Sequence, residues 1–252
     1  MWLILLVAVI AAEPTLAQSR ASKRHVRAPS TSPAYRRMRT RWHKKAPRAE
    51  RRAFDTQTLP PLTLVPGNGG TRVSLQPQSE AGDFATEEVI NAEAALAWRA
   101  DESTHQIHPR LLTLVYQALL HFRAPFAWVV SGYRANSETS RHRLGHAVDL
   151  VLPGVSDRQL AAYFQSKGFV GVGLYPVSGF VHLDVREQSF FWIDRSGPNQ
   201  RPRVQPILKQ RARAMDRKAR RQGQQPPLLE APSPQEELAA TKPSELPTKP
   251  VD

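Results

Sequence analysis

Apolar residues with regular spacing are confined to the middle of the chain, between residues 84 and 200, and this confinement limits the fold most strongly. Residues 54–200 carry 14 acidic and 11 basic residues, whereas residues 18–52 carry 13 Lys and Arg against a single acid. The net charge of +13 therefore reflects the flanking segments, and it does not make the whole chain a basic nucleic-acid-binding domain. We expect one packed domain with long flanking segments.

The N-terminus carries the features of an export signal. Residues 2–12 form a short apolar run, WLILLVAVIAA, and Thr15 and Ala17 follow at the spacing of a signal-peptidase site. We therefore expect a signal peptide over residues 1–17 and a periplasmic or extracellular location, where nucleic acid is not an expected partner. No Lys or Arg precedes the run, so an uncleaved membrane anchor is the alternative.

The segments on either side of the central region are basic and contain many prolines. We predict that residues 18–83 form a disordered basic arm and linker, because a basic segment without apolar periodicity buries too little surface to offset its chain entropy. Residues 201–252 are predicted to be a basic segment, helical in part over 204–221, and then a Pro/Glu-rich tail. Such arms suit either binding to anionic polymers or a membrane surface, or a role as a solvated spacer.

The central region, residues 84–200, contains helical patterns first and mostly strand patterns afterwards. Helices are predicted at 87–99, at 107–122 and from Asp157 to about Gly168, and strands at 126–132, 146–152, 179–185 and 189–194. The last two strands are close enough in sequence to form a hairpin. This order predicts an α+β domain with a small antiparallel sheet and helices packed on one side.

Histidines and acids gather in two stretches, residues 140–149 and 182–184. Strand alternation places His182 and Asp184 on one face of their strand, and Asp149 on one face of an earlier strand. An acid between two apolar neighbours is costly to bury unless it is paired or bound to a cation. Two imidazoles and one carboxylate can hold a catalytic zinc or an iron(II) ion. Zinc is favoured, because the iron pattern would need a later histidine and none follows His182. The chain has no cysteine, which excludes thiol ligands and thiol nucleophiles.

Three motifs in order resemble the zinc D-Ala-D-Ala peptidases, and most closely their YcbK-like murein endopeptidase branch. The motifs are SGYR at 131–134, SxHxxGxAxD at 140–149 and HxD at 182–184. The resemblance covers roughly residues 85–200 and implies peptidoglycan stem peptides as substrate. It also implies a Zn²⁺ cofactor with the ligands His142, Asp149 and His182.

The resemblance assigns further residues to the chemistry. It implies that Arg134 binds the substrate carboxylate or stabilises the oxyanion, and that Ser140 contacts a ligand or the backbone. Relatives carry an acidic general base three residues before the last zinc histidine, where this chain has Gly179. Asp184 is the nearby acid that could replace this base, or it could instead orient a zinc-bound histidine.

Three functions follow as hypotheses. The first is an exported zinc metallopeptidase that hydrolyses peptide bonds of peptidoglycan with a metal-activated water, as an endopeptidase or carboxypeptidase. The second is a non-catalytic, zinc-containing peptidoglycan-binding module with basic arms for anionic wall polymers. Gly179 and the short segment between Arg134 and Ser140 favour this second hypothesis. The third is a scaffold whose basic arms do the binding.

Overall fold

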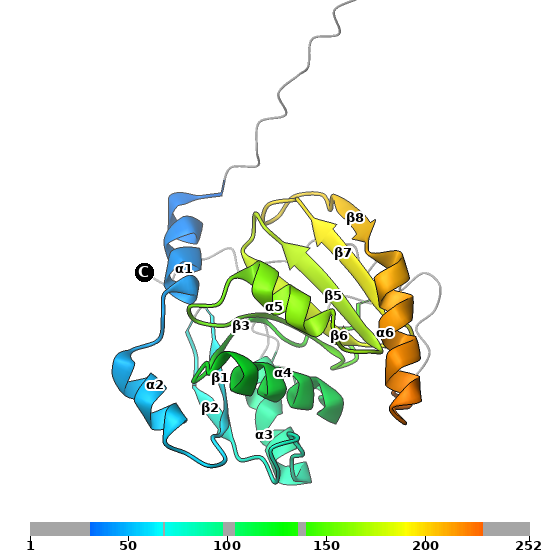
Figure 1. Ribbon diagram of the computed structural model, residues 1–252. Coiled ribbons are helices and arrows are strands. Elements are labelled where there is room, and N and C mark those ends of the chain that lie inside the picture. The colour runs from blue at the N-terminus through cyan, green and yellow to red at the C-terminus, as the bar shows by residue number, and fades with distance from the viewer. Residues whose placement is uncertain (1–30, 68, 98–103, 136–139, 229–252) are drawn as a thin grey trace, which may run out of the picture.

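The computed structural model describes residues 31–67, 69–97, 104–135 and 140–228, which form one sheet with helices packed against it (Figure 1). The helices are α1 (Pro33–His43), α2 (Arg48–Asp55), α3 (Thr86–Leu96), α4 (Pro109–Phe122), α5 (Asp157–Phe164) and α6 (Lys209–Arg221). The strands are β1 (Leu62–Pro66), β2 (Val73–Leu75), β3 (Ala127–Ser131), β4 (Ala147–Val151), β5 (Val170–Tyr175), β6 (Phe180–Val185), β7 (Phe190–Asp194) and β8 (Val204–Ile207). Within the described ranges, no helix is both long and apolar enough to cross a membrane. The predicted signal peptide and the Pro/Glu-rich tail beyond residue 228 lie outside those ranges.

The α+β class is confirmed, but the sheet is larger than expected and mixed. Its eight strands lie in the order β2-β1-β3-β4-β6-β5-β7-β8, with parallel pairing of β1 with β3 and of β5 with β7. The predicted hairpin of 179–185 with 189–194 is wrong, because β5 lies between β6 and β7. Gly171 and Gly173 concealed β5 in the sequence, since glycine is depleted in strands.

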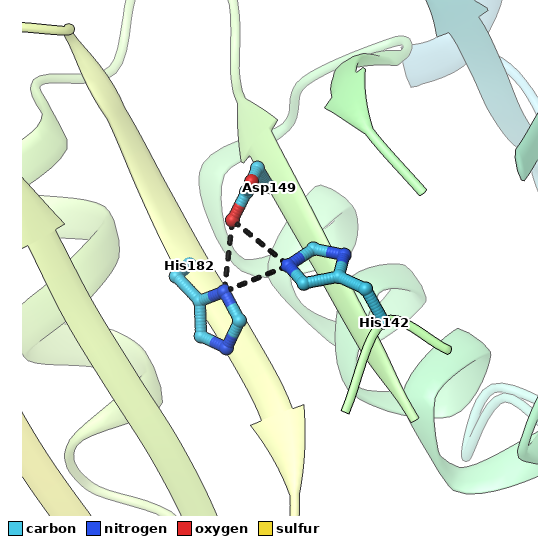
Figure 2. A group of neighbouring side chains, drawn as sticks. All are labelled: His142, Asp149 and His182. Carbon is cyan, nitrogen blue, oxygen red and sulfur yellow. Dashed lines mark hydrogen bonds and ion pairs between the residues drawn. The ribbon is translucent and has the colours of Figure 1, made fainter. Parts of the chain in front are cut away.

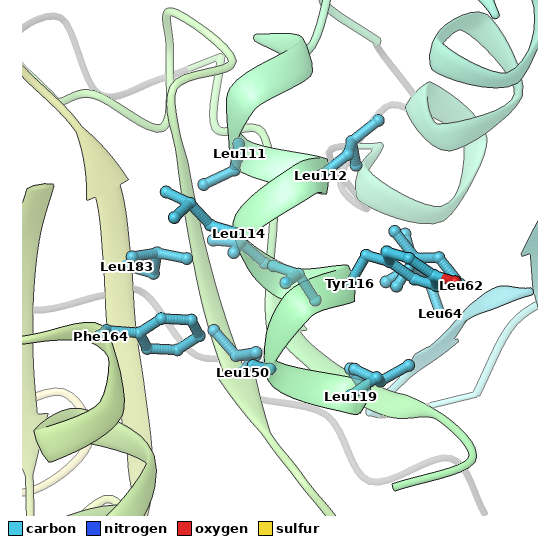
Figure 3. Close-up of a cluster of buried hydrophobic side chains, with 14 of the residues drawn as sticks. Leu62, Leu64, Leu111, Leu112, Leu114, Tyr116, Leu119, Leu150, Phe164 and Leu183 are labelled. Atoms are coloured by element: carbon cyan, nitrogen blue, oxygen red, sulfur yellow. The ribbon is translucent and has the colours of Figure 1, made fainter. Parts of the chain in front are cut away.

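The main hydrophobic core lies between one face of the sheet and the helices α3, α4 and α5 (Figure 3). α4 contributes a buried stripe that includes Leu112 and Leu119, and α5 contributes Phe164. These side chains pack with Leu150 of β4 and Leu183 of β6. Because successive residues of a strand point to opposite faces, the residues next to Leu150 and Leu183 must face away from this core.

The prediction that residues 18–83 are a disordered arm is wrong for the part that the structure describes. Residues 33–75 contain α1, α2, β1 and β2, and α1 packs on the sheet face opposite to the main core. Tyr35 and Trp42 anchor α1, because seven residues place them on the same face of a helix two turns apart. The expectation of helices on one side is therefore also corrected. The basic composition concealed α1, since its arginines surround two buried aromatic residues.

The domain also extends further toward the C-terminus than predicted. Residues 201–221 hold the edge strand β8 and the helix α6 rather than an unpacked basic segment, although the predicted helix at 204–221 is present in part. Asp216 of α6 is buried and accepts hydrogen bonds from the backbone N–H groups of Phe169 and Ser189, both at 2.8 Å. These bonds fix α6 to the start of β5 and to β7.

Candidate metal centre

His142, Asp149 and His182 lie together on the sheet face that is turned away from the main core (Figure 2). His182 Nδ1 lies 2.8 Å from Asp149 Oδ1 and 3.2 Å from His142 Nε2, and His142 Nε2 lies 3.5 Å from Asp149 Oδ1. All three residues are buried. Tetrahedral zinc with bonds of 2.0–2.1 Å to nitrogen and oxygen holds its ligand atoms about 3.3 Å apart. The spacing and the types of the three donor atoms therefore fit a divalent ion such as zinc.

Two neighbouring strands and one loop bring these ligands together. Asp149 of β4 and His182 of β6 are direct partners in an antiparallel pair, so their side chains share a face. His142 comes from the loop before β4, where its backbone N–H donates to Ser140 Oγ at 3.2 Å. The convergence that the sequence predicted for these three residues is thus found in the structure, although their role as ligands stays a prediction.

Each of the two imidazoles has an outer hydrogen-bond partner of the kind that supports metal-binding histidines. His142 Nδ1 lies 2.6 Å from the carbonyl oxygen of Gly132, which can only accept, so Nδ1 carries the proton and Nε2 keeps its lone pair. His182 Nε2 lies 3.0 Å from Asp184 Oδ2 and can donate to it, while Nδ1 lies 2.8 Å from Asp149 Oδ1. His142 Nε2 and His182 Nδ1 thus both face Asp149, and each ring has an outer hydrogen-bond partner on its far side, as metal-binding histidines do.

Burial and charge keep two of the three residues in their metal-binding protonation states. Burial, with a contribution from Arg134, lowers the pKa of His142 to about 4, so its ring is neutral at pH 7. Burial alone would raise the pKa of Asp149, but His142 and Arg134 hold it well below its usual range. Burial would lower the pKa of His182, whereas its hydrogen bonds to Asp149 and Asp184 raise it above the usual value. A proton therefore competes most strongly at His182.

The contacts of Asp184 favour the positioning role among the two that the sequence left open. Arg186 donates to it twice, from Nε to Oδ1 at 2.7 Å and from Nη2 to Oδ2 at 2.6 Å. Arg141 Nε lies 3.6 Å from Oδ1, and His182 donates to Oδ2. The residue is fully buried behind the His182 ring, on the side opposite to the ligating Nδ1. Its two oxygens are engaged away from the group of His142, Asp149 and His182, which favours the positioning role, and both roles stay predictions.

Arg134 and Ser140 also support the ligands. Arg134 donates from Nη2 to Asp149 Oδ2 and from Nε to Ser131 Oγ at 2.8 Å. This contact occupies one oxygen of Asp149 and leaves Oδ1 facing the two imidazoles. The Ser140 hydroxyl accepts the N–H of His142. The backbone contact expected as one alternative for Ser140 is thus present, and substrate binding by Arg134 stays a prediction.

Gly179, at the position of the family's acidic base, lies in the tight turn between β5 and β6. Its φ of +76° is strained for any other residue, and a Cβ there would lie 2.3 Å from Arg39 Nε. Arg39 comes from α1, so the side chain of a different segment occupies the space beside this position. An acid at residue 179 would have to displace Arg39.

The sequence reasoning missed an aromatic wall beside His182. Gly173 of β5 is the direct partner of His182, and a Cβ on it would lie 2.5 Å from the ring of Trp192. The Trp192 ring thus covers Gly173, 5.1 Å from the centroid of His182, and its Nε1 donates to the Tyr175 hydroxyl at 3.2 Å. The sequence did hold one indication of this arrangement. In β5, Gly171, Gly173 and Tyr175 alternate onto one face, which leaves room there for a large ring from a neighbouring strand.

Two imidazoles and one carboxylate set in this way in an α+β domain are the donor set of a metal-dependent hydrolase of the metallopeptidase type, and this group could hold such a metal ion. Residues 71–189 match the model of a peptidase family of the M15 group, described as peptidoglycan L,D-endopeptidase MepK. This segment contains all three motifs, and the match confirms its resemblance to the murein endopeptidases among the zinc D-Ala-D-Ala peptidases. Neither the curated proteins nor the solved structures gave a significant match.

Proposed function

We propose that the protein is a zinc-dependent peptidase that hydrolyses peptide bonds in the stem peptides or cross-links of peptidoglycan. The family match supports a peptidase that acts on peptidoglycan, and it favours an L,D bond as the target. The observation that carries the proposal is the convergence of two imidazole nitrogens and one carboxylate oxygen in a single buried group.

In this mechanism the protein holds the metal and keeps its surroundings ordered. His142 Nε2, His182 Nδ1 and Asp149 Oδ1 would be the three protein ligands. When bound, zinc supplies a Lewis acid for the scissile carbonyl and lowers the pKa of its water toward neutrality. Asp184 holds the His182 tautomer, and Arg134 keeps the Asp149 carboxylate ionised and oriented. The outer hydrogen bonds thus pre-organise the ligands before the metal binds.

The ring of Trp192 would form one side of the substrate site. It lies against His182 and is almost completely buried, so it keeps bulk water away from that ligand. Exclusion of water strengthens the electrostatic interactions of a site with a polarised carbonyl.

The test is metal analysis of the purified full-length chain, followed by digestion of isolated peptidoglycan with and without a chelator. We expect about one zinc per chain, and muropeptide release that the chelator abolishes. His142→Ala should lose both zinc and activity. His121→Ala removes an exposed histidine on α4, outside the cluster, and should lose neither. Zinc bound without cleavage would instead identify a peptidoglycan-binding module, and absence of zinc in folded protein would refute the metal site.

We also propose that the protein acts outside the cytoplasm. Its proposed substrate lies there, and residues 1–17 carry the pattern of a signal peptide or an uncleaved anchor. Fractionation of cells that express the tagged full-length chain, with mass determination of its N-terminus, distinguishes a cleaved signal from an anchor. Retention in the cytoplasm would refute this proposal without affecting the metal site.

A further inference from the structure

Helix α1 lies outside the family match at 71–189, yet it packs on the sheet face that carries the metal centre. Its anchors Tyr35 and Trp42 belong to a cluster that includes Val151 and Phe180. Val151 and Phe180 are each two residues from a predicted ligand on the same strand and the same face. Two residues of a strand span about 7 Å. α1 therefore borders the metal centre directly.

The two flanks of α1 face different ways. Arg39 donates to the carbonyl oxygen of Val177 at 3.0 Å, and His43 bonds Asp157 at the start of α5 at 2.9 Å. Both contacts are with segments beyond the strand ends, in the β5–β6 turn and after β4. Helical spacing places Arg41 on the opposite flank, and Arg37, one turn earlier, lies between that flank and the solvent-facing side of α1. That flank faces along the strands toward the metal centre.

The flank that faces the metal centre is cationic and exposed. Arg37 and Arg41 are both exposed, and the Arg41 guanidinium lies over the Trp128 ring, 5.0 Å from its centroid. Neither side chain forms an ion pair with any carboxylate in the part of the chain that the structure describes. α1 contains no acidic residue. Two unpaired guanidinium groups one helical turn apart suit a ligand with free carboxylates, which arginine binds through paired hydrogen bonds.

We propose that Arg37 and Arg41 of α1 form a carboxylate-binding wall of the substrate site, which engages free carboxylates of peptidoglycan stem peptides beside the metal centre. The identity of the ligand rests on the proposed function. The wall itself rests on the docking of α1, the direction of its flanks and its charge. It gives this chain a substrate contact from a segment outside the matched peptidase domain.

The test measures binding without catalysis. Full-length protein kept metal-free with a chelator is sedimented with insoluble peptidoglycan, either native or with its carboxyl groups amidated. The double variant R37Q/R41Q is compared with R213Q/R217Q, which removes two exposed arginines at the same spacing from α6. α6 packs at β7 and the main core, away from the metal-centre face.

We expect R37Q/R41Q to bind native peptidoglycan about three- to tenfold more weakly, since exposed charge pairs are each worth up to about 1 kcal/mol. The control variant should bind native material as the wild type does, and amidated material should bind all three proteins equally weakly. An equal loss in both variants, a loss that persists on amidated material, or no binding by the wild type would overturn the proposal. No step of this binding test requires hydrolysis. A protein that shows this binding pattern but does not cleave peptidoglycan would therefore refute the proposed function and leave the carboxylate-binding proposal standing. Unchanged melting temperatures exclude unfolding as the cause.

Discussion

Replacement of Asp184 by asparagine separates the two roles that an acid beside His182 can have. The substitution keeps the size of the side chain but removes the negative charge that faces Arg186 and Arg141. Asparagine can also turn its NH₂ group toward His182 Nε2. Nε2 would then accept this hydrogen bond, and the proton of the neutral ring would lie on Nδ1, the nitrogen expected to bind the metal. We expect Asp184→Asn to weaken both the fold and the metal site.

The expected magnitudes follow from the complete burial of Asp184. Loss of one partner from a buried ion pair leaves an uncompensated charge and costs about 3–5 kcal/mol of the free energy of unfolding. Loss of the outer partner of a metal-binding histidine typically weakens metal affinity by about 10- to 100-fold. At an ordinary domain stability of about 5–15 kcal/mol, Asp184→Asn should therefore stay folded, and its zinc affinity can be measured.

The assay is a zinc titration against a competing chelator, with the free energy of unfolding measured in urea on the metal-free protein. Asp216→Asn is the matched control, because Asp216 is also buried and hydrogen-bonded but lies at α6. The control should lose stability and keep its zinc affinity. If Asp184→Asn binds zinc as tightly as the wild type while hydrolysis is lost, the positioning role is refuted and Asp184 is the general base after all.

Three further variants test other parts of the structure. Gly173→Ala should lower the free energy of unfolding by about 1–3 kcal/mol, because the new methyl group meets the Trp192 ring; an unchanged urea midpoint would mean that the ring yields freely. Trp42→Ala should cost about 3–5 kcal/mol in the same assay and make the N-terminal segment more sensitive to protease, unless α1 is only loosely docked. The hydrogen bond to Asp157 raises the pKa of His43, so the pair stabilises the fold fully below about pH 6.5 and this contribution falls as pH rises through the raised pKa. Asp157→Asn should accordingly cost up to about 1 kcal/mol at pH 5.5 and less at pH 9, and a cost that grows with pH would contradict this sign.

The convergence of Asp149 and His182 on one sheet face could be predicted from the sequence because its determinants are local. The alternation of a strand fixes the faces of Asp149 and His182 from their immediate neighbours, without knowledge of the rest of the fold. The resemblance to the zinc D-Ala-D-Ala peptidases then added His142 as an expected ligand. The long helices were also predictable, since the stripe along α4 repeats over several turns. Each of these features is encoded within a few residues.

The supporting residues depend on contacts between distant segments, so the sequence did not reveal their partners, although an orienting role for Asp184 was one of the two that it allowed. Nothing near Asp184 in the sequence indicates that Arg141 would approach it from another loop, and nothing near Arg134 indicates a bond to Asp149. The N-terminal helix was missed for a different reason. Average composition is dominated by arginine there, whereas two aromatic side chains supply the buried surface that docks α1.

The lack of a side chain at Gly173 limits which substitutions the metal-centre face can accept. A larger residue at 173 fits only after the indole at 192 has been replaced by something smaller, so the two positions are epistatic and the order of substitution matters. Single-site libraries would score position 173 as intolerant. Paired libraries that begin at Trp192 should recover folded proteins with a reshaped substrate site.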